Sequence, residues 1–510
     1  MQKTYLPSRV WFLLILSLLS LPNFLHGQTY LDSLYGISVP FFQEVARGAY
    51  EMEDASIVFI YTSIDGFENQ RHIRIGRIEG NGELVFDKGV NDTASSKSVF
   101  DFMRTLDGNF VACGRYIDLT TDTISYYLVK FSPLGDEIWS RIYRTSDFIA
   151  ECLAVYPLAD GGFLLAGQQI VYNPNPIPGH ALVIRVDSTG EELWRQTYGV
   201  DNWQEVIKSI APTPDGGFLM AGYGINPYGS HVEYQGFLLK TDSLGNEQWM
   251  QRYGEANGSE VFLAIQPTSD GNFLVTGDIN YSPVTIANIG ADWVLKVTVE
   301  GEILWDRKYM DRQGYNWLED FVQLPDGSIV AAGATTGTPN GSQAGFLIKI
   351  TAEGDSLWSH IYDRHPGYID LFYSISATMD GGFVMSGFSR QPDGSSQDVW
   401  ILKVDSLGCA MPGCFATDVA EEPVAPLGKL EVWPNPFRSL LKVRLPAAVS
   451  NTPERLRLLA LSGQVLWEKD LPPGATEIEA DLAVLPAGLY FLLYERQGLP
   501  PMAAKVLKGV

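Results

Sequence analysis

A stretch of 53 to 56 residues recurs along most of this chain and constrains its fold more than any other feature. The clearest copy is 204–254, where two turns separate four short apolar runs. In the turns Asp215-Gly216-Gly217 and Asp242-Ser243-Leu244-Gly245, Asp bonds its own backbone and Gly adopts a positive φ. The apolar runs have the length and composition of strands. Each copy therefore predicts a four-stranded antiparallel meander, with strands a to d.

The copies can be aligned on the Asp of the first turn. This anchor recurs at Asp107, Asp160, Asp215, Asp270, Asp326 and Asp380, with a degenerate copy at Asp54. A Gly stands seven residues after each clear anchor, and strand c carries a basic residue in every copy: Arg77, Lys130, Arg185, Lys240, Lys296, Lys349 and Lys403. Four strands in a period of this length are typical of a β-propeller, and seven anchors predict seven blades.

The seventh copy lacks the Trp that strand d carries in five others, but the start of the chain offers a replacement. Leu31-Asp32-Ser33-Leu34-Tyr35 before Gly36 is similar to the strand-d segment that ends at Tyr198 and Gly199. We expect residues 29–35 to form the outer strand of blade seven and to leave the ring without a long free edge. The propeller would span residues 28–414.

The remaining segments have distinct compositions. Residues 1–27 read as a secretory signal peptide, with Lys3 and Arg9 before an apolar run that is too short for a membrane span. No later run is long enough either, so we expect no transmembrane segment. The acidic, Pro-rich residues 415–428 read as a linker. The net charge of −24 makes nucleic acid an improbable partner.

The four cysteines and six histidines indicate no metal or cofactor chemistry. Cys409 and Cys414 lie in one short stretch at the end of blade seven, and export permits a disulfide between them. Cys113 and Cys152 are expected to be buried apolar residues. No spacing resembles a zinc site, and no His accompanies a nucleophile motif. We therefore expect no catalytic residues, no metal and no cofactor.

Residues 429–510 alternate apolar and polar residues in short runs, without a copy of the repeat, which predicts a small immunoglobulin-like β-sandwich. The stretches Val432–Phe437, Leu461–Val465, Asp481–Phe491 and Lys505–Lys508 resemble the type A C-terminal sorting domain of the type IX secretion system of Bacteroidota. The matching motif residues are Pro434, Asn435, Pro436, Gly463, Gly488, Tyr490 and Lys505. One departure is Ala460-Leu461, where the family usually has an aromatic residue and an Asp or Asn.

This resemblance implies export to the cell surface, the outer membrane or the extracellular space, with the type IX secretion machinery as a partner. In the family the sorting domain is often removed, which would place cleavage in the linker. The alternative is an ordinary accessory sandwich domain. The propeller repeat is similar to repeats of secreted bacterial propellers of unassigned function, so it carries little functional meaning.

Two groups of residues are candidate sites. The long, varied b–c and d–a loops lie on one face, and such loops commonly carry binding sites. Their aromatic residues could stack on sugars or anchor a protein: Trp203, Tyr228, Tyr234, Tyr281, Tyr315, Trp317 and Tyr368. The alternative is that these rings lie between blades.

Carboxylates also recur near the start of strand a, which should line the central channel: Glu44, Glu151, Glu205, Glu260, Glu319 and Asp370. They could hold a cation or act as an acid and base. The favoured interpretation is structural, with these groups paired to the strand-c Lys and Arg residues, because catalytic sites are asymmetric and this pattern repeats.

The leading hypothesis is a monomeric, secreted, non-catalytic module that binds a polysaccharide or a surface protein. The alternatives are a glycan-active hydrolase or lyase and a scaffold for surface assembly. A hydrolase would need two non-repeated carboxylates about 5–10 Å apart in a central pocket. A binding module would show an aromatic surface without that pair.

Overall fold

The computed structural model describes residues 30–35, 43–64, 70–90, 94–145, 148–171, 179–200, 203–226, 232–254, 259–279, 291–309, 315–339, 341–392, 396–411, 431–445, 454–460, 465–472, 475–486, 488–496 and 499–509. The expected signal peptide and linker lie outside these ranges. The chain divides into two compact units, Met1–Val419 and Ala420–Val510. Within the described ranges no helix has the length and apolar character needed to cross a membrane.

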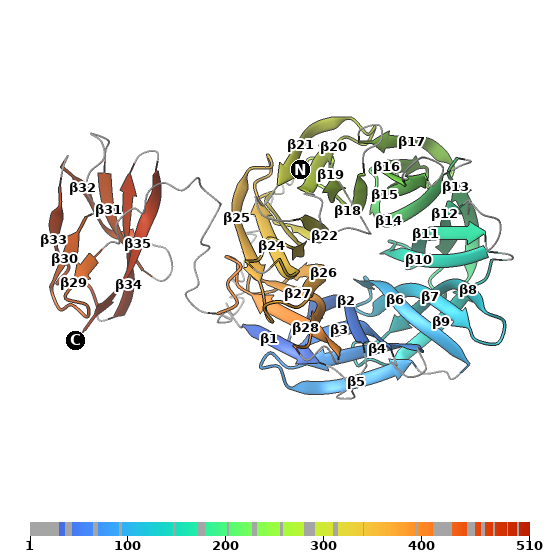
Figure 1. The fold of residues 1–510 in the computed structure, drawn as a ribbon, viewed down its shortest axis with the longest axis horizontal. Coiled ribbons are helices and arrows are strands. Elements are labelled where there is room, and N and C mark those ends of the chain that lie inside the picture. Colours follow the sequence, from blue (N-terminus) through green and yellow to red (C-terminus); the bar gives the residue numbers. More distant parts are fainter. Residues whose placement is uncertain are drawn as a thin grey trace, which may run out of the picture. The chain divides into compact units, whose positions relative to one another are not determined.

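The first unit is a ring of seven four-stranded antiparallel blades, which confirms the predicted propeller (Figure 1). Blade one is β2 (Gln43–Glu51), β3 (Ile57–Ile64), β4 (Arg71–Ile78) and β5 (Leu84–Val90). Blade two is β6 (Ser95–Arg104), β7 (Phe110–Asp118), β8 (Thr123–Phe131) and β9 (Glu137–Tyr143). Blade three is β10 (Phe148–Pro157), β11 (Phe163–Val171), β12 (Gly179–Val186) and β13 (Glu192–Tyr198).

Blade four is β14 (Gln204–Pro212), β15 (Phe218–Asn226), β16 (Glu233–Thr241) and β17 (Glu247–Tyr253). Blade five is β18 (Val261–Pro267), β19 (Phe273–Ile279), β20 (Ala291–Val297) and β21 (Ile303–Tyr309). Blade six is β22 (Asn316–Gln323), β23 (Ile329–Thr335), β24 (Ala344–Ile350) and β25 (Ser356–Tyr362). Blade seven is β26 (Asp370–Ala377), β27 (Phe383–Arg390), β28 (Gln397–Val404) and β1 (Leu31–Tyr35).

The seventh blade takes its outer strand from the start of the chain. β1 runs antiparallel to β28, with Leu31 opposite Lys403 and Tyr35 opposite Val399. The Trp400 indole donates to the Asp32 carboxylate over 2.8 Å. The two ends of the propeller sequence therefore share one sheet, and the edge of β28 is covered.

Neighbouring blades are joined by a repeated contact between strand d of one blade and the c–d turn of the next. The Tyr198 hydroxyl donates to the Gly245 carbonyl over 2.6 Å. Gly245 has φ +80°, and a Cβ there would lie 2.6 Å from the Trp194 ring. Equivalent Tyr-to-Gly bonds are Tyr35–Gly82, Tyr143–Gly190, Tyr253–Gly301, Tyr309–Gly354 and Tyr362–Gly408. Tyr35 makes this bond from β1, so β1 occupies the strand-d position of its blade.

The basic residue of strand c pairs with the anchor Asp of its own blade. The pairs are Arg77–Asp54, Lys130–Asp107, Arg185–Asp160, Lys240–Asp215, Lys296–Asp270 and Lys403–Asp380. The expected pairing of these residues with Glu44, Glu151, Glu205, Glu260, Glu319 and Asp370 is therefore wrong. The reason is geometric, because the a–b turn folds back over strand c, whereas the start of strand a lies at the opposite end of the blade.

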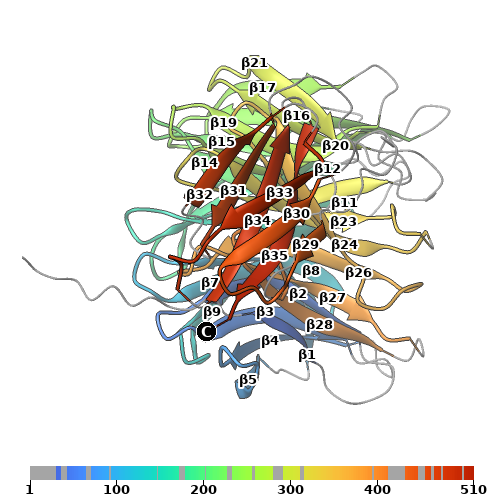
Figure 2. The same ribbon diagram turned by 90° about the vertical axis from the view of Figure 1, so that its left-hand side faces the viewer.

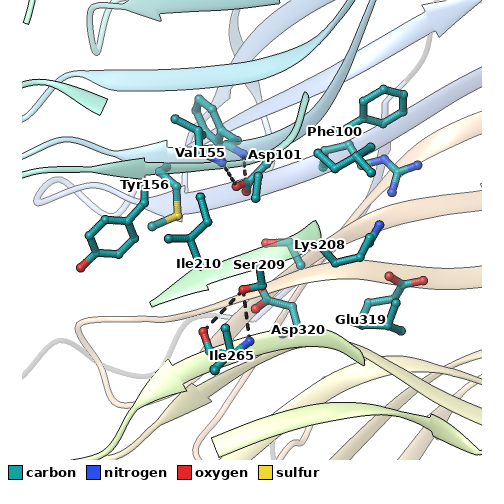
Figure 3. Close-up of a pocket in the computed structure, with 18 of the residues that line it drawn as sticks. Phe100, Asp101, Val155, Tyr156, Lys208, Ser209, Ile210, Ile265, Glu319 and Asp320 are labelled. Carbon is teal, nitrogen blue, oxygen red and sulfur yellow. Dashed lines mark hydrogen bonds between the residues drawn. The ribbon is translucent and has the colours of Figure 1, made fainter. Parts of the chain in front are cut away.

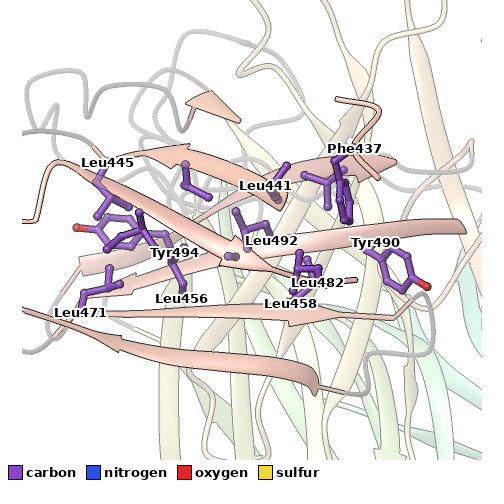
Figure 4. Close-up of a cluster of buried hydrophobic side chains, with 14 residues drawn as sticks. Phe437, Leu441, Leu445, Leu456, Leu458, Leu471, Leu482, Tyr490, Leu492 and Tyr494 are labelled. Carbon is purple, nitrogen blue, oxygen red and sulfur yellow. The ribbon is translucent and has the colours of Figure 1, made fainter. Parts of the chain in front are cut away.

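The second unit is a two-layered β-sandwich, as predicted. Its first sheet holds β29 (Glu431–Trp433), β30 (Leu440–Arg444) and β33 (Glu477–Asp481). The second sheet runs in the order β32 (Val465–Leu471), β31 (Glu454–Leu459), β34 (Gly488–Arg496) and β35 (Leu499–Lys508). Figure 2 shows the strands of both sheets face on. Buried side chains from both sheets, including Phe437, Leu441, Leu458 and Leu492, fill the space between them (Figure 4).

The residues of the sorting motif hold the last strand in place. The Asn435 side chain accepts a hydrogen bond from the Leu507 amide over 2.8 Å. The amide of buried Phe437 donates to the Leu507 carbonyl over 2.8 Å. The Tyr490 hydroxyl donates to the Pro486 carbonyl over 2.7 Å. Pro434 and Pro436 are exposed, Gly488 begins β34, Lys505 lies in β35, and Gly463 falls outside the described residues.

Candidate functional site

The first strand of every blade contains one extra residue. The pairing of β14 with β15 shifts between Ile207 and Ser209, so Lys208 has no partner across the ladder. The other six first strands shift at the corresponding place. A β-bulge of this kind turns its extra residue away from the regular alternation of the strand.

The Gly seven residues after each clear anchor makes room for this bulge. A Cβ on Gly222 would lie 1.9 Å from the Val206 carbonyl oxygen on the bulged strand. The same backbone approach occurs at Gly114, Gly167, Gly277, Gly333 and Gly387. Only a residue without a Cβ permits this distance. The repeated Gly therefore permits the close approach of the bulged strand in six blades, whereas blade one, which has its bulge at Arg47, has Tyr61 at the equivalent place.

The seven extra residues form the feature that we call the bulge ring: Arg47, Phe100, Leu153, Lys208, Leu263, Glu319 and Tyr373. All seven are half-buried and line one cavity. Since each comes from the first strand of a different blade, the cavity lies on the axis of the propeller.

The cavity has a volume of about 400 Å³. It extends from the bulge ring along the second halves of the first strands, where Val155, Tyr156, Ile265 and Gln266 line it. Figure 3 shows Phe100, Lys208 and Glu319 together at one end and Tyr156 at the other. The charged groups of the ring are therefore gathered at one end of the channel.

The residue after the bulge joins neighbouring blades in three places. Asp101 accepts hydrogen bonds from the Phe102 amide over 2.7 Å and from the Val155 amide of the next blade over 2.8 Å. Asp320 accepts hydrogen bonds from the Phe321 amide and from the Ile375 amide of the next blade, the latter over 3.1 Å. The Ser209 hydroxyl accepts from the Ile265 amide (Figure 3). Burial raises the pKa of Asp101, and it raises the pKa of Asp320 to about 7.

The ring also contains a stacked cation. The Arg47 guanidinium lies 3.6 Å from the centre of the Tyr373 ring and 5.9 Å from that of Phe100. Lys208 stands nearby, and burial lowers the pKa of its ammonium. Glu319 acts in the opposite direction on that pKa, and Arg47 adds to the lowering. The ring thus presents two cations, one carboxylate and two aromatic rings.

The six carboxylates predicted for the channel do not occupy equivalent positions. Four of them stand three residues before the bulge residue of their blade and are buried: Glu44, Glu205, Glu260 and Asp370. Glu151 lies one position later than Glu205 does in its blade, and Glu319 is itself the bulge residue of its blade. Only Glu319 of the six lines the axial cavity.

The buried carboxylates hold the d–a loops. Glu205 accepts from the Val200 amide over 3.3 Å and pairs with Arg252 over 2.7 Å. Asp370 accepts from the Arg364 amide over 2.8 Å and from the His365 amide. Gly199 has φ +138°, and a Cβ there would lie 2.2 Å from a Glu205 oxygen. These contacts are structural, because the amide bonds tie the end of a d–a loop to the strand that follows it, and the Arg252 pair joins the first and last strands of blade four.

Glu151 joins the first strand of blade three to a cation of blade two. Its carboxylate pairs with Arg115 over 2.8 Å and accepts from the Gln168 amide group over 3.0 Å. The Arg115 guanidinium also lies 5.7 Å from the Phe100 ring centre. Glu151 therefore neutralises a cation beside the bulge ring.

The predicted loop-face aromatics are found in separate small groups. Trp203 lies under the Arg252 guanidinium at 4.0 Å. Tyr234 contacts Tyr223, with ring centres 6.2 Å apart, and Tyr315 contacts Trp317 at 5.4 Å. Tyr368 is half-buried, while Tyr228 and Tyr281 lie outside the described residues. Trp317 and Tyr373 of the bulge ring adjoin the same buried cluster of Ala334, Leu371 and Phe388.

The cysteines and the potential metal ligands complete the set of predicted sites. Cys409 is disulfide-bonded, and Cys414 lies outside the described residues. Cys113 and Cys152 are free and buried. In the part of the chain that the structure describes, no three His, Cys, Asp or Glu residues gather where they could hold a metal ion.

Comparison with known proteins identifies the second unit. Residues 431–506 match the secretion system C-terminal sorting domain. The chain therefore carries a type IX secretion sorting domain, uses the type IX machinery, and is secreted to the cell surface or the extracellular space. A search among curated proteins finds no match.

Several solved structures are similar to the propeller at low identity. A protein of unknown function from Dyadobacter fermentans is 10% identical, with 65% of this chain and 97% of that chain covered and a TM-score of 0.40. An α-L-arabinanase from Penicillium chrysogenum is 10% identical, with 74% and 98% covered and a TM-score of 0.40. A polysaccharide lyase described as an ulvan lyase is 9% identical, with 72% and 96% covered and a TM-score of 0.44. These similarities carry no information about the activity of this chain.

Proposed function

We propose that this type IX secretion cargo is a non-catalytic binding protein for a glycan, displayed on the cell surface or released from it. The observation that carries the proposal is the chemical variety of the bulge ring. The residues before the bulge are apolar in all seven blades, from Ala46 to Phe372, and so are those two positions after it, from Ala49 to Ile375. The ring between them holds basic, acidic, aromatic and aliphatic side chains.

This contrast distinguishes residues that maintain the fold from residues that could bind a ligand. Positions that repeat from blade to blade are those that the fold uses, such as the anchor Asp in all seven blades and the Gly opposite the bulge in six. Varied side chains on a rigid frame are typical of binding sites. A cavity of about 400 Å³ lies within the usual range for small-molecule ligands. We therefore place the ligand at the axis of the propeller.

Aromatic residues support a sugar ligand, because the apolar face of a sugar ring stacks well on a flat aromatic ring. Phe100 and Tyr373 belong to the ring itself, and Trp317 adjoins the same buried cluster as Tyr373. Trp203, Tyr234, Tyr315 and Tyr368 would extend the contact surface over the loops of the described part of the chain. A protein partner on the cell surface is the other ligand that such a surface could bind.

The carboxylates of the cavity favour binding over glycoside hydrolysis. Hydrolysis by the usual mechanisms needs a pair of carboxyl groups. Asp101 and Asp320 each accept two backbone amides, one of them from the next blade, so both have structural roles. Glu319 is the remaining carboxylate among the residues described around the cavity. We propose further that residues 415–428 form the linker where the sorting domain is removed, and that Cys409 pairs with Cys414.

The proposal can be tested with the exported chain and a panel of plant and marine polysaccharides, with product release followed in the same wells. We expect binding without products, and weaker binding by Trp317→Ala and Trp203→Ala. Released oligosaccharides would contradict the non-catalytic assignment. Absence of binding to every polysaccharide would contradict the glycan ligand and favour a protein partner.

A further inference from the structure

The bulge ring contains two cations without an ion-pair partner. Lys240 and five other basic residues of strand c have a carboxylate within 4.0 Å. Among the described residues, Arg47 and Lys208 have none at that distance. A partly buried cation without a counter-charge is unfavourable. Glu319 lies in the same ring but not within ion-pair distance, so the ring has a place for an anion in direct contact with these two cations.

The electrostatics of Lys208 agree with this geometry. Burial is the main cause of the lowered pKa of its ammonium, and the approach of Arg47 lowers it further. Glu319, Asp101 and Glu151 raise that pKa without cancelling the effect of burial. An anion bound beside Lys208 would offset the cost of keeping this charge inside the cavity.

Arg47 can offer several hydrogen-bond donors to an anion. Its guanidinium lies 3.6 Å from the centre of the Tyr373 ring. A guanidinium has five N–H donors in a planar fork, and carboxylate and sulfate bind such a fork in a bidentate manner. The contact with Tyr373 holds the cation in the ring before a ligand arrives.

The charge of the whole chain limits the number of acidic groups on the ligand. A net charge of −24 repels polyanions at long range. Screening confines such fields to about 8 Å at physiological salt, so local cations still act inside the cavity. Glu319 adds an acceptor for ligand hydroxyls, while Phe100, Leu153 and Leu263 offer apolar contact. These properties fit a mostly neutral sugar with one acidic group.

We infer that the bulge ring binds a sugar that carries a single carboxylate or sulfate, with the acidic group between Arg47 and Lys208 and a hydroxyl on Glu319. The inference rests on the proposed glycan-binding function and names its ligand class. A uronate and a sulfated sugar share this chemistry, and the experiment below separates them.

The test is a calorimetric titration of the exported chain with three matched probes: glucuronate, glucose 6-sulfate and glucose. We expect at least one acidic probe to bind about tenfold more tightly than glucose, which corresponds to about 1.4 kcal/mol. Lys208→Met should weaken that binding at least about tenfold, since the apolar stem stays and the charge is lost. Lys208→Arg should retain it.

Two further variants separate an anion site from general damage. Glu319→Gln should tighten binding of the acidic probe about two- to fivefold, because it removes the competing negative charge. Lys308→Met removes a charge from an exposed position on β21 and should change nothing. Thermal unfolding of every variant shows whether it is folded.

The contrary outcomes distinguish this inference from the function on which it rests. Equal affinity for glucose and glucuronate, or unchanged binding by folded Lys208→Met, would overturn the anion site. Polysaccharide binding that persists in that variant would then leave the glycan-binding function in place. Acidic probes that bind while no polysaccharide does would retain the site and overturn the glycan module. Failure of all three probes would overturn the site.

Discussion

The Lys240 ammonium lies 2.8 Å from the Asp215 carboxylate and joins strand c of blade four to the turn between strands a and b. The side chain of Lys240 is 3% exposed, whereas that of Asp215 is 51% exposed. Lys240 also donates to the Thr241 carbonyl over 2.9 Å and to the Gln248 side chain over 2.8 Å. The pair therefore closes one end of the blade with a buried cation and a carboxylate that faces water.

Lys240→Met should destabilise the propeller by about 1–2 kcal/mol, because Asp215 loses its partner while remaining half in solvent. Chemical denaturation followed by tryptophan fluorescence measures this loss. Lys308→Met is the matched control at an exposed position. If both variants unfold at the same denaturant concentration, the pair contributes nothing to stability.

Acid should weaken the same pair. The hydrogen bond from Lys240 is the main cause that lowers the pKa of Asp215 below its ordinary value of 3.8. A carboxyl group whose pKa is lower in the folded state than in the unfolded state stabilises the fold at pH values above its unfolded-state pKa. This contribution is lost as the pH falls through its folded-state pKa. The stability difference between wild type and Lys240→Met should therefore shrink below pH 3.8. A difference that stays constant there would contradict the ion pair as its source.

Asp292→Asn should have the opposite effect and stabilise the protein at neutral pH. Asp292 stands across the ladder from Asp278 and is fully buried, and neither of its carboxylate oxygens has a hydrogen-bond partner among the described residues. Burial raises its pKa well above 3.8. The destabilisation of the folded state by the charge of Asp292 is therefore absent below the pKa of this group in the unfolded chain. It grows as the pH rises towards the pKa of the group in the folded protein.

The measurement is thermal unfolding of wild type and Asp292→Asn between about pH 4 and pH 8, a range that begins near the ordinary carboxyl pKa. Removal of an unpartnered buried charge should stabilise the variant by about 1–3 kcal/mol at the upper end of this range, with little gain at the lower end. Asp355→Asn, at an exposed turn position, provides the control. A variant that is less stable than wild type at the upper end would indicate that the charge of Asp292 has a favourable partner in solution.

The repeat was sufficient to predict the ring, because its turns and apolar runs are local signals that recur with one period. The seven blades and the C-terminal sandwich follow from that pattern. Ion pairs such as Lys240–Asp215 were missed, although both partners recur in every copy. The signal was available, because a meander places the a–b and c–d turns at the same end of a blade and Lys240 stands just before the c–d turn.

The bulge ring is not evident from apolar periodicity. One extra residue shifts the alternation of apolar and polar positions, and only a few residues on either side define that alternation. Two signals were available in the sequence. The repeated Gly, such as Gly222, marks a close backbone approach, and the distance to the anchor differs between Glu205 and Glu319. Glu205 lies ten residues before Asp215 and Glu319 lies seven before Asp326, which is why one is buried and the other lines the cavity.

The β1 strand should be needed for a stable ring. Deletion of residues 30–36 would expose the edge of β28 and remove the bonds from Trp400 to Asp32 and from Tyr35 to Gly82. We expect this variant to aggregate on heating at lower temperature than wild type. Tyr35→Phe should cost about 1 kcal/mol, as should Tyr253→Phe at an internal blade junction. Aggregation is followed by light scattering, and stability by thermal unfolding. If the deletion variant matches wild type in both, closure of the ring by β1 is dispensable.

Gly222→Ala tests the link between the bulge and the proposed site. A Cβ at residue 222 would lie 1.9 Å from the Val206 carbonyl, so the strands must separate or the bulge must be lost. We expect a loss of about 1–3 kcal/mol in stability and a displaced Lys208, with weaker binding of the acidic probe. Gly216→Ala is the control, since Gly216 has φ +83° and nothing within 4 Å of the added Cβ. That control should lose about 1 kcal/mol from backbone strain alone and bind normally. A Gly222→Ala protein that is as stable as the control and binds the probe as wild type does would show that neither the bulge nor the placement of Lys208 depends on this glycine.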